Sequence, residues 1–97
     1  MKIWNASRMN TLYYSADVAA ENNRCVVKLE GERILVEYES DGCIYQYQGS
    51  EMGAGHYHLT CAENGGRASL HGFTDSAFLE GSWVEGGERG MWKIQLA

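Results

Sequence analysis

The stretch that decides the fold runs from Leu79 to Leu96 and reads LEGSWVEGGERGMWKIQL. Two adjacent glycines at its centre, Gly86-Gly87, suit a two-residue turn between antiparallel strands. An aromatic ring that lies across from a strand glycine covers the exposed backbone and stabilises the pair. The turn predicts a β-hairpin with these pairs: Trp83 with Gly90, Gly81 with Trp92, Leu79 with Ile94 and Ala77 with Leu96.

Similar turn signals recur upstream, at Gly31-Glu32, Asp41-Gly42, Asn64-Gly65 and Thr74-Asp75. Because side chains alternate between the two faces of a strand, each turn fixes which residues share a face. The predicted hairpins agree on which face is buried. They predict these pairs: Cys25 with Tyr38, Leu29 with Ile34, Val27 with Val36, Tyr38 with Tyr45, Val36 with Tyr47, Tyr57 with Gly72, Leu59 with Leu70, His58 with His71, Leu70 with Leu79 and Ala68 with Gly81.

The hairpins predict an all-β protein, an antiparallel up-and-down meander of about seven or eight strands. Residues 15–23 are expected to form a loop or one helical turn. Glycine is frequent, with 12 of 97 residues, and proline is absent, which suits a sheet without exposed edges. We expect one domain, residues 1–97, with a closed or nearly closed barrel, and a two-sheet sandwich as the alternative. The expected strands are 24–30, 33–40, 43–49, 55–62, 67–73, 77–85 and 88–96, with a shorter segment at 12–14.

The two closing strands, Gly81-Ser82-Trp83 and Gly90 to Leu96, resemble those of small up-and-down barrels such as lipocalin-like and avidin-like domains. The likeness covers less than a quarter of the chain. It supports the barrel as an analogy of fold, and it carries over no ligand and no site residue.

The charge pattern bears on the partners of the chain. The net charge is −5, and the eight basic residues are spread along the sequence, whereas a phosphate backbone requires clustered cations. No apolar run approaches the roughly 20 residues of a membrane-spanning helix, and the first residues do not resemble a secretion signal. We therefore expect a cytoplasmic protein that binds neither nucleic acid nor membrane.

Three cysteines, Cys25, Cys43 and Cys61, are expected to point into the buried face as reduced, small apolar side chains. No catalytic motif stands out, so no catalytic residue is assigned and an enzyme is the less favoured class. Three histidines, His56, His58 and His71, are predicted to converge on the outer face of the sheet. Such a trio resembles a β-sheet zinc site with an open position for water, and solvent-facing histidines are the alternative.

Four tyrosines and two tryptophans are predicted to face the barrel interior. Buried phenols need hydrogen-bond partners, so their hydroxyls are expected to reach water at a barrel mouth or to line a ligand pocket. The leading hypothesis is a binding module that holds a small molecule in an aromatic-lined interior or mouth. Its candidate ligand-binding residues are Tyr38, Tyr45, Tyr47, Tyr57, Trp83 and Trp92.

Two further hypotheses remain open. Phe73 and Phe78 are predicted on neighbouring strands of the outer face, beside the histidines, where they would form an apolar patch. A homodimer through this patch would make the protein a structural or interaction domain. A zinc-dependent hydrolase that uses the three histidines is the most distant hypothesis.

Overall fold

Eight antiparallel strands follow one another along the chain in a computed structural model, which describes residues 1–14 and 18–97. Each strand pairs with its neighbours in sequence, and β1 pairs with β8, so the sheet closes into a barrel. The predicted meander and barrel are confirmed, and the closed strand order excludes the two-sheet sandwich. The strands are β1 Lys2–Tyr13, β2 Ala19–Glu30, β3 Arg33–Ser40, β4 Cys43–Glu51, β5 His56–Cys61, β6 Arg67–His71, β7 Phe78–Glu85 and β8 Glu88–Gln95.

The hairpins with two-residue turns have the predicted registers. Asp41 and Gly42 have positive φ angles of 52° and 79°, as a type I′ turn requires. Close approach of neighbouring strands explains the glycine within β8, because a Cβ at Gly90 would overlap the backbone oxygen of Leu12 and crowd the ring of Trp83. The confirmed pairs include Val27 with Val36, Tyr38 with Tyr45, Trp83 with Gly90 and Gly81 with Trp92.

The predicted register between β5 and β6 is wrong by two residues. Leu59 faces Ala68 instead of Leu70, and His71 faces His56 instead of His58. The Cys61 N–H donates to the backbone oxygen of Gly66 at 2.9 Å. The connection between β5 and β6 is therefore longer than the predicted two-residue turn. A shift by two residues keeps every side chain on its predicted face.

The predicted register between β6 and β7 is also wrong by two residues. Leu70 faces Gly81 instead of Leu79, and Ala68 faces Trp83 instead of Gly81. Residues 72–77 form the connection, so the turn is longer than Thr74-Asp75 alone. We name residues 72–77 the β6–β7 connection.

Strand β1 is much longer than the predicted segment at residues 12–14. A bulge between Trp4 and Ser7 changes the alternation of the strand, so both side chains face the interior although they are an odd number of residues apart. The Ser7 hydroxyl accepts from the Ala97 N–H at 3.2 Å and donates to the Trp4 carbonyl at 3.1 Å. Of the expected loop or helical turn at 15–23, residues 19–23 belong to β2, and residues 15–17 lie outside the described residues.

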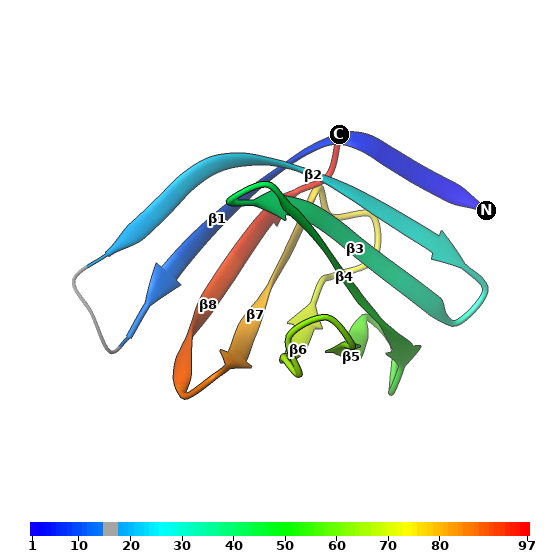
Figure 1. Cartoon of the computed structure of the whole chain (residues 1–97). Coiled ribbons are helices and arrows are strands. Elements are labelled where there is room, and N and C mark those ends of the chain that lie inside the picture. Colours follow the sequence, from blue (N-terminus) through cyan, green and yellow to red (C-terminus); the bar gives the residue numbers. More distant parts are fainter. Residues whose placement is uncertain (15–17) are drawn as a thin grey trace.

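The seam between β1 and β8 closes the barrel along only part of β1. It runs from Arg8 opposite Gln95 to Tyr13 opposite Gly90, and the Ala6 N–H donates to the Ala97 oxygen beyond it. Residues 2–4 pair with β2 and have no partner on β8. Figure 1 shows this first part of β1 projecting past the end of β8. One backbone edge of β1 is therefore open at this end of the barrel.

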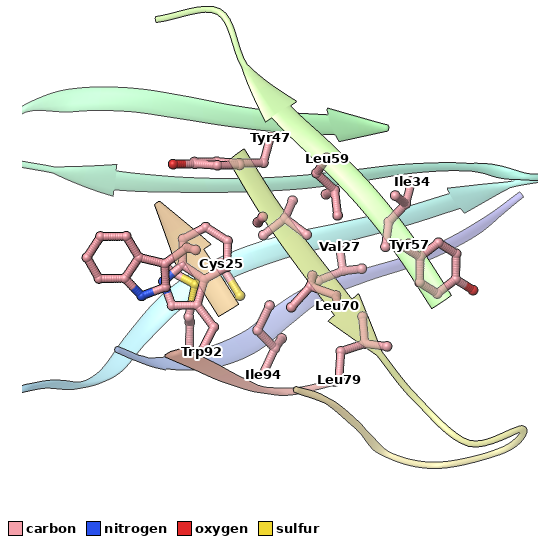
Figure 2. Packing of buried hydrophobic residues seen from close by; sticks show 14 of the residues in the cluster. Cys25, Val27, Ile34, Tyr47, Tyr57, Leu59, Leu70, Leu79, Trp92 and Ile94 are labelled. Carbon is pink, nitrogen blue, oxygen red and sulfur yellow. The ribbon is translucent and has the colours of Figure 1, made fainter. Parts of the chain in front are cut away.

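The interior of the barrel holds the hydrophobic core (Figure 2). Cys25 and Cys61 are buried as predicted, but Cys43 is exposed. Cys43 follows the Asp41-Gly42 turn at the rim of the barrel, where the inward direction of a side chain no longer implies burial. Within the described ranges, no helix is long and apolar enough to cross a membrane. The buried apolar residues are Met9, Cys25, Val27, Ile34, Val36, Tyr47, Tyr57, Leu59, Cys61, Ala68, Leu70, Leu79, Trp83, Trp92 and Ile94.

Candidate ligand site at the barrel mouth

The six aromatic residues predicted to face the interior all belong to the core or pack against it. Four of them are buried, with at most 9 % of the surface of each residue exposed: Tyr47, Tyr57, Trp83 and Trp92. Tyr38 and Tyr45 are partly buried. They divide into two groups at opposite ends of the core, and the two groups have different surroundings.

Five of the six rings pack on one another at one end of the barrel. Tyr38 links Tyr45 and Trp92, with ring centroids 5.6 Å and 5.9 Å away. Trp83 and Trp92 lie 6.3 Å apart with nearly parallel planes. A sixth ring, which the sequence analysis missed, lies edge-on to Trp83 at 4.9 Å and belongs to Tyr13. We name these residues the aromatic cluster: Tyr13, Tyr38, Tyr45, Tyr47, Trp83 and Trp92.

Two polar atoms in the aromatic cluster have hydrogen-bond partners within the protein. The Tyr47 hydroxyl donates to Glu85 Oε2 at 3.0 Å, and the Trp83 Nε1–H donates to the Met91 carbonyl at 3.3 Å. Burial raises the pKa of the Tyr38 and Tyr47 phenols, and the nearby Glu85 carboxylate adds to this effect. The aromatic cluster therefore has the properties of a packed core in which the Tyr47 hydroxyl has a partner within the protein.

Tyr57 lies at the opposite end of the core from Tyr47 and Trp92, with its hydroxyl directed away from the packed side chains (Figure 2). A cavity of about 480 Å³ adjoins it. We name this space the mouth cavity. Its lining is Lys2, Trp4, Leu29, Glu51, Gly55, Tyr57, Gly72, Phe73, Thr74, Asp75, Ser76, Ala77, Phe78, Leu79 and Leu96.

The mouth cavity exists because β1 separates from β8 there. The bulge before Ser7 keeps Trp4 facing inward while the strand leaves the seam, and the β6–β7 connection lies on the other side. Two loops meet at the same end, where the Gly72 N–H donates to the Gly55 oxygen at 2.9 Å. Gly55 has a φ of 71°, and a Cβ there would overlap the Gly72 oxygen, so the contact requires glycine.

One carboxylate lies beside the Tyr57 phenol in the mouth cavity, that of Glu51. Burial and the neighbouring Glu51 carboxylate raise the pKa of Tyr57. The same carboxylate accepts a hydrogen bond from the Gly55 N–H, with 3.2 Å between the nitrogen and Oε2. Lys2 and Asp75 add one charge of each sign. An apolar wall with a few polar groups can hold and orient a small molecule.

The three predicted histidines do converge on the outer face. His56 stacks on His71 with ring centroids 4.4 Å apart, and His58 lies edge-on to His56 at 4.7 Å. His56 Nε2 is 3.1 Å from Ser69 Oγ, and His71 Nδ1 is 3.4 Å from the Glu80 carbonyl oxygen. Partial burial and the two neighbouring imidazoles lower the pKa of His56. The neutral form of His56 is therefore favoured.

A metal centre at the histidines gains no support from this geometry. Among residues 1–14 and 18–97, no group of three His, Cys, Asp or Glu side chains has an arrangement that could hold a metal ion. Parallel stacking places the imidazoles of His56 and His71 face to face, whereas zinc ligands direct ring nitrogens at a common point.

The predicted placement of Phe73 and Phe78 is partly wrong. Phe78 is the first residue of β7, but Phe73 lies in the β6–β7 connection instead of on a strand, because β6 ends at His71. Their exposed fractions are 92 % for Phe73 and 38 % for Phe78. The Lys93 ammonium lies 4.8 Å from the Phe78 ring centroid. An outer groove of about 750 Å³ has these residues in its lining, together with Tyr14, His56, His71, Glu80 and Met91.

Comparison of the chain with protein-family models, with curated proteins and with solved structures finds no match. The candidate site therefore rests on the geometry of this chain alone.

Sequence reasoning missed Trp4, Leu29 and Glu51 as residues of the mouth cavity. Leu29 was assigned to the buried face, so its position at one end of the barrel was the missing information. Trp4 lies before the bulge, where the alternation of β1 changes. No local sequence signal relates these residues, because the mouth cavity forms only when β1, β2, β4 and the β6–β7 connection meet.

Proposed function

We propose that the protein is a small-molecule binding module whose site is the mouth cavity. The observation that carries the proposal is the cavity of about 480 Å³ next to Tyr57, which is within the usual range for ligand pockets of about 300–1,000 Å³. Of the six aromatic residues that the sequence suggested as ligand contacts, Tyr57 alone lines this cavity. The other five belong to the aromatic cluster, which stabilises the fold in this proposal.

The division between the two ends supports a site at the mouth. Tyr47 and Trp92 are in ring contact and at most 2 % exposed, so a ligand could reach them only by displacing core side chains. In contrast, Trp4, Leu29 and Leu96 are only partly buried and pack against the core. A ligand in the mouth cavity would cover their remaining apolar surface, at about 25 cal/mol for each Å² removed from water.

The proposal is tested with the neutral fluorescent probe N-phenyl-1-naphthylamine, whose emission rises in apolar surroundings. Ala77 lines the mouth cavity and its side chain is exposed, so Ala77→Trp would obstruct the opening without changing a core residue. Ala19→Trp, at an exposed position outside the lining of the mouth cavity, is the matched control.

We expect saturable binding to the unchanged protein, a loss of about ten-fold in affinity for Ala77→Trp, and none for Ala19→Trp. Absence of saturable binding, or equal affinity of both variants, would contradict the proposal. Unfolding curves of both variants establish that each is folded under the conditions of the titration.

A second candidate function is homodimerisation through the outer face. The outer groove carries the exposed rings of Phe73, Phe78 and Tyr14. Exposed apolar residues that form one contiguous patch often mark an interface, whereas scattered ones do not. Glu80 and Lys93 form an ion pair of 3.7 Å on the same face. In a two-fold symmetric dimer, the acidic groups of this face in one copy can pair with the basic groups of the same face in the other copy. We therefore propose a second copy of this chain as the partner.

A cytoplasmic location also remains a proposal. Its support is that Cys25, Cys43 and Cys61 are all free thiols, as is usual for proteins in reducing compartments. When a lysate of the native host is treated with an alkylating reagent under denaturing conditions, mass spectrometry should then find all three cysteines alkylated.

A further inference from the structure

The chemistry of the mouth cavity points to a class of ligand, and this inference rests on the proposed function. Glu51 is the last residue of β4 and is partly buried. Its carboxylate accepts from the Gly55 N–H and lies beside the Tyr57 phenol. In the part of the chain that the structure describes, Lys93 and Glu80 form an ion pair, and Glu51 takes part in none. Glu51 therefore has no basic side chain within ion-pair distance.

We propose that the mouth cavity binds a small amphipathic cation, an organic amine whose ammonium group lies against Glu51 and Tyr57 and whose apolar body lies against Trp4 and Leu29. The ammonium group would donate to the free oxygen lone pairs of the Glu51 carboxylate and to the phenol oxygen. Hydrogen bonds between an ammonium group and a carboxylate are about twice as strong as those between neutral groups.

Aromatic rings beside the carboxylate favour the same class of ligand. Trp4 and Tyr57 both line the mouth cavity, and the face of an indole or phenol ring attracts a cation. An aromatic pair with one carboxylate can hold an ammonium group, whereas the same electrostatics disfavour an anion.

The other charges around the mouth cavity do not reverse this preference. Asp75 adds a second carboxylate, and Lys2 adds one ammonium group at the exposed start of β1. An anionic ligand that approached Lys2 would meet both Glu51 and Asp75. A cationic ligand would meet two carboxylates and one ammonium group.

The open edge of β1 provides further acceptors. Residues 2–4 pair with β2 and have no strand partner on the other side, although the Trp4 carbonyl accepts from the Ser7 hydroxyl at 3.1 Å. Carbonyl oxygens accept hydrogen bonds from an ammonium group.

Three probes with one ring system separate charge from shape. They are 1-naphthylmethylamine, a cation at neutral pH, 1-naphthalenemethanol, which is neutral, and 1-naphthoic acid, an anion. We expect the cation to bind the unchanged protein about ten-fold more tightly than the alcohol, and the acid to bind most weakly. Two-dimensional NMR titration gives each dissociation constant and reports shifts of the Gly55 and Trp4 resonances.

Two variants with equal change in net charge complete the test. Glu51→Gln keeps an oxygen that can accept from the Gly55 N–H but removes the charge. Glu39→Gln changes an exposed carboxylate on β3 outside the lining of the mouth cavity. We expect Glu51→Gln to lower the affinity for the amine about ten-fold and to leave that for the alcohol unchanged, while Glu39→Gln changes neither.

The outcomes distinguish this inference from the proposed function. Equal affinities for amine and alcohol, or equal losses in Glu51→Gln and Glu39→Gln, would overturn the cation preference and leave binding at the mouth intact. If none of the three naphthalene probes and no N-phenyl-1-naphthylamine binds, both proposals are wrong. If the acid binds most tightly, Lys2 and not Glu51 determines the charge of the ligand.

Discussion

Tyr47 and Trp92 meet edge to face across the interior of the barrel, with ring centroids 4.9 Å apart and ring planes at 84°. Tyr47 is on β4 and Trp92 on β8, which are not adjacent in the sheet. Their contact therefore joins opposite walls of the barrel. Edge-to-face pairs contribute about 0.5–1.5 kcal/mol beyond the burial of their surface.

Replacement of Trp92 by alanine should strongly destabilise the fold. The indole is 2 % exposed and contacts three other rings of the aromatic cluster. Deletion of a buried aromatic side chain costs about 3–5 kcal/mol, and that could exceed half the stability of a domain of this size. Urea unfolding measures the loss, and Phe73→Ala at an exposed position is the control. An unchanged midpoint for Trp92→Ala would mean that the indole is not in the core.

The hydrogen bond of Tyr47 can be separated from the packing of its ring. Tyr47→Phe keeps the ring but removes the hydroxyl, which donates to Glu85 at 3.0 Å. We expect a loss of about 1–3 kcal/mol in the free energy of unfolding, because a hydrogen bond to a charged group is lost. Tyr14 is 59 % exposed, so Tyr14→Phe should change the free energy of unfolding little. Equal effects of the two substitutions would contradict the prediction.

Stability should fall in alkaline solution, in part through Cys25. Burial raises the pKa of this thiol from about 9 to about 11. The unfolded chain therefore releases the proton first, so the stabilisation is complete below pH 9 and is lost as the pH rises towards 11. Two pKa units correspond to at most about 2.7 kcal/mol.

Unfolding free energies of the protein and of Cys25→Val between about pH 8 and pH 10.5 give the contribution of this thiol. The curve of Cys25→Val should decline less over this range. Ala19→Val, at an exposed position without a titratable side chain, should follow the curve of the unchanged protein. A parallel decline in all three proteins would show that the Cys25 thiol is not responsible.

Ser7 should act through the bulge of β1. Its hydroxyl bonds the backbone at both Trp4 and Ala97, and the residue is fully buried. Ser7→Ala leaves these backbone groups without that partner, and we expect a loss of about 1–3 kcal/mol in stability and weaker probe binding at the mouth cavity. Ser82→Ala on the exposed face of β7 is the control. Unchanged probe affinity in Ser7→Ala would separate the bulge from the site.

The proposed homodimer should weaken in acidic solution, because His56, whose pKa is lowered by partial burial and the neighbouring imidazoles, gains a proton below the ordinary imidazole value of about 6.5. Protonation of His56 would add positive charge to the face that carries Lys93, where Glu80 also lies. Sedimentation of about 100 µM protein near pH 8 and near pH 5.5 measures this. A monomer at both values removes the hypothesis, and a dimer that is unaffected by Phe78→Ser places the interface elsewhere.

Local turn chemistry explains how much of the fold was predictable. Asp41-Gly42 and Gly86-Gly87 determine register because a two-residue turn leaves no alternative pairing of the strands that follow. Asn64-Gly65 resembles such a turn, but the Gly66 carbonyl accepts from Cys61, so the loop is longer. The error was two residues, and therefore it changed the partners of side chains but not their faces.

The mouth cavity could not be predicted from local patterns. β1 carries polar Ser7 and Thr11 on its inner side, and its bulge interrupts the alternation that identifies a strand. Trp4 was consequently not assigned to any strand. Tyr57 was predicted to face inward, but its position at the end of the barrel depends on closure between the first and last strands.

The seam between β1 and β8 also has a kinetic consequence. Every other ladder joins strands that are neighbours in the sequence and can form as a local hairpin, whereas the seam joins the two ends of the chain. Its formation requires the largest loop-closure entropy, so we expect it to form late during folding. Until then the chain would be an open sheet with two unpaired borders, and molecules at this stage would be the ones most prone to associate into aggregates.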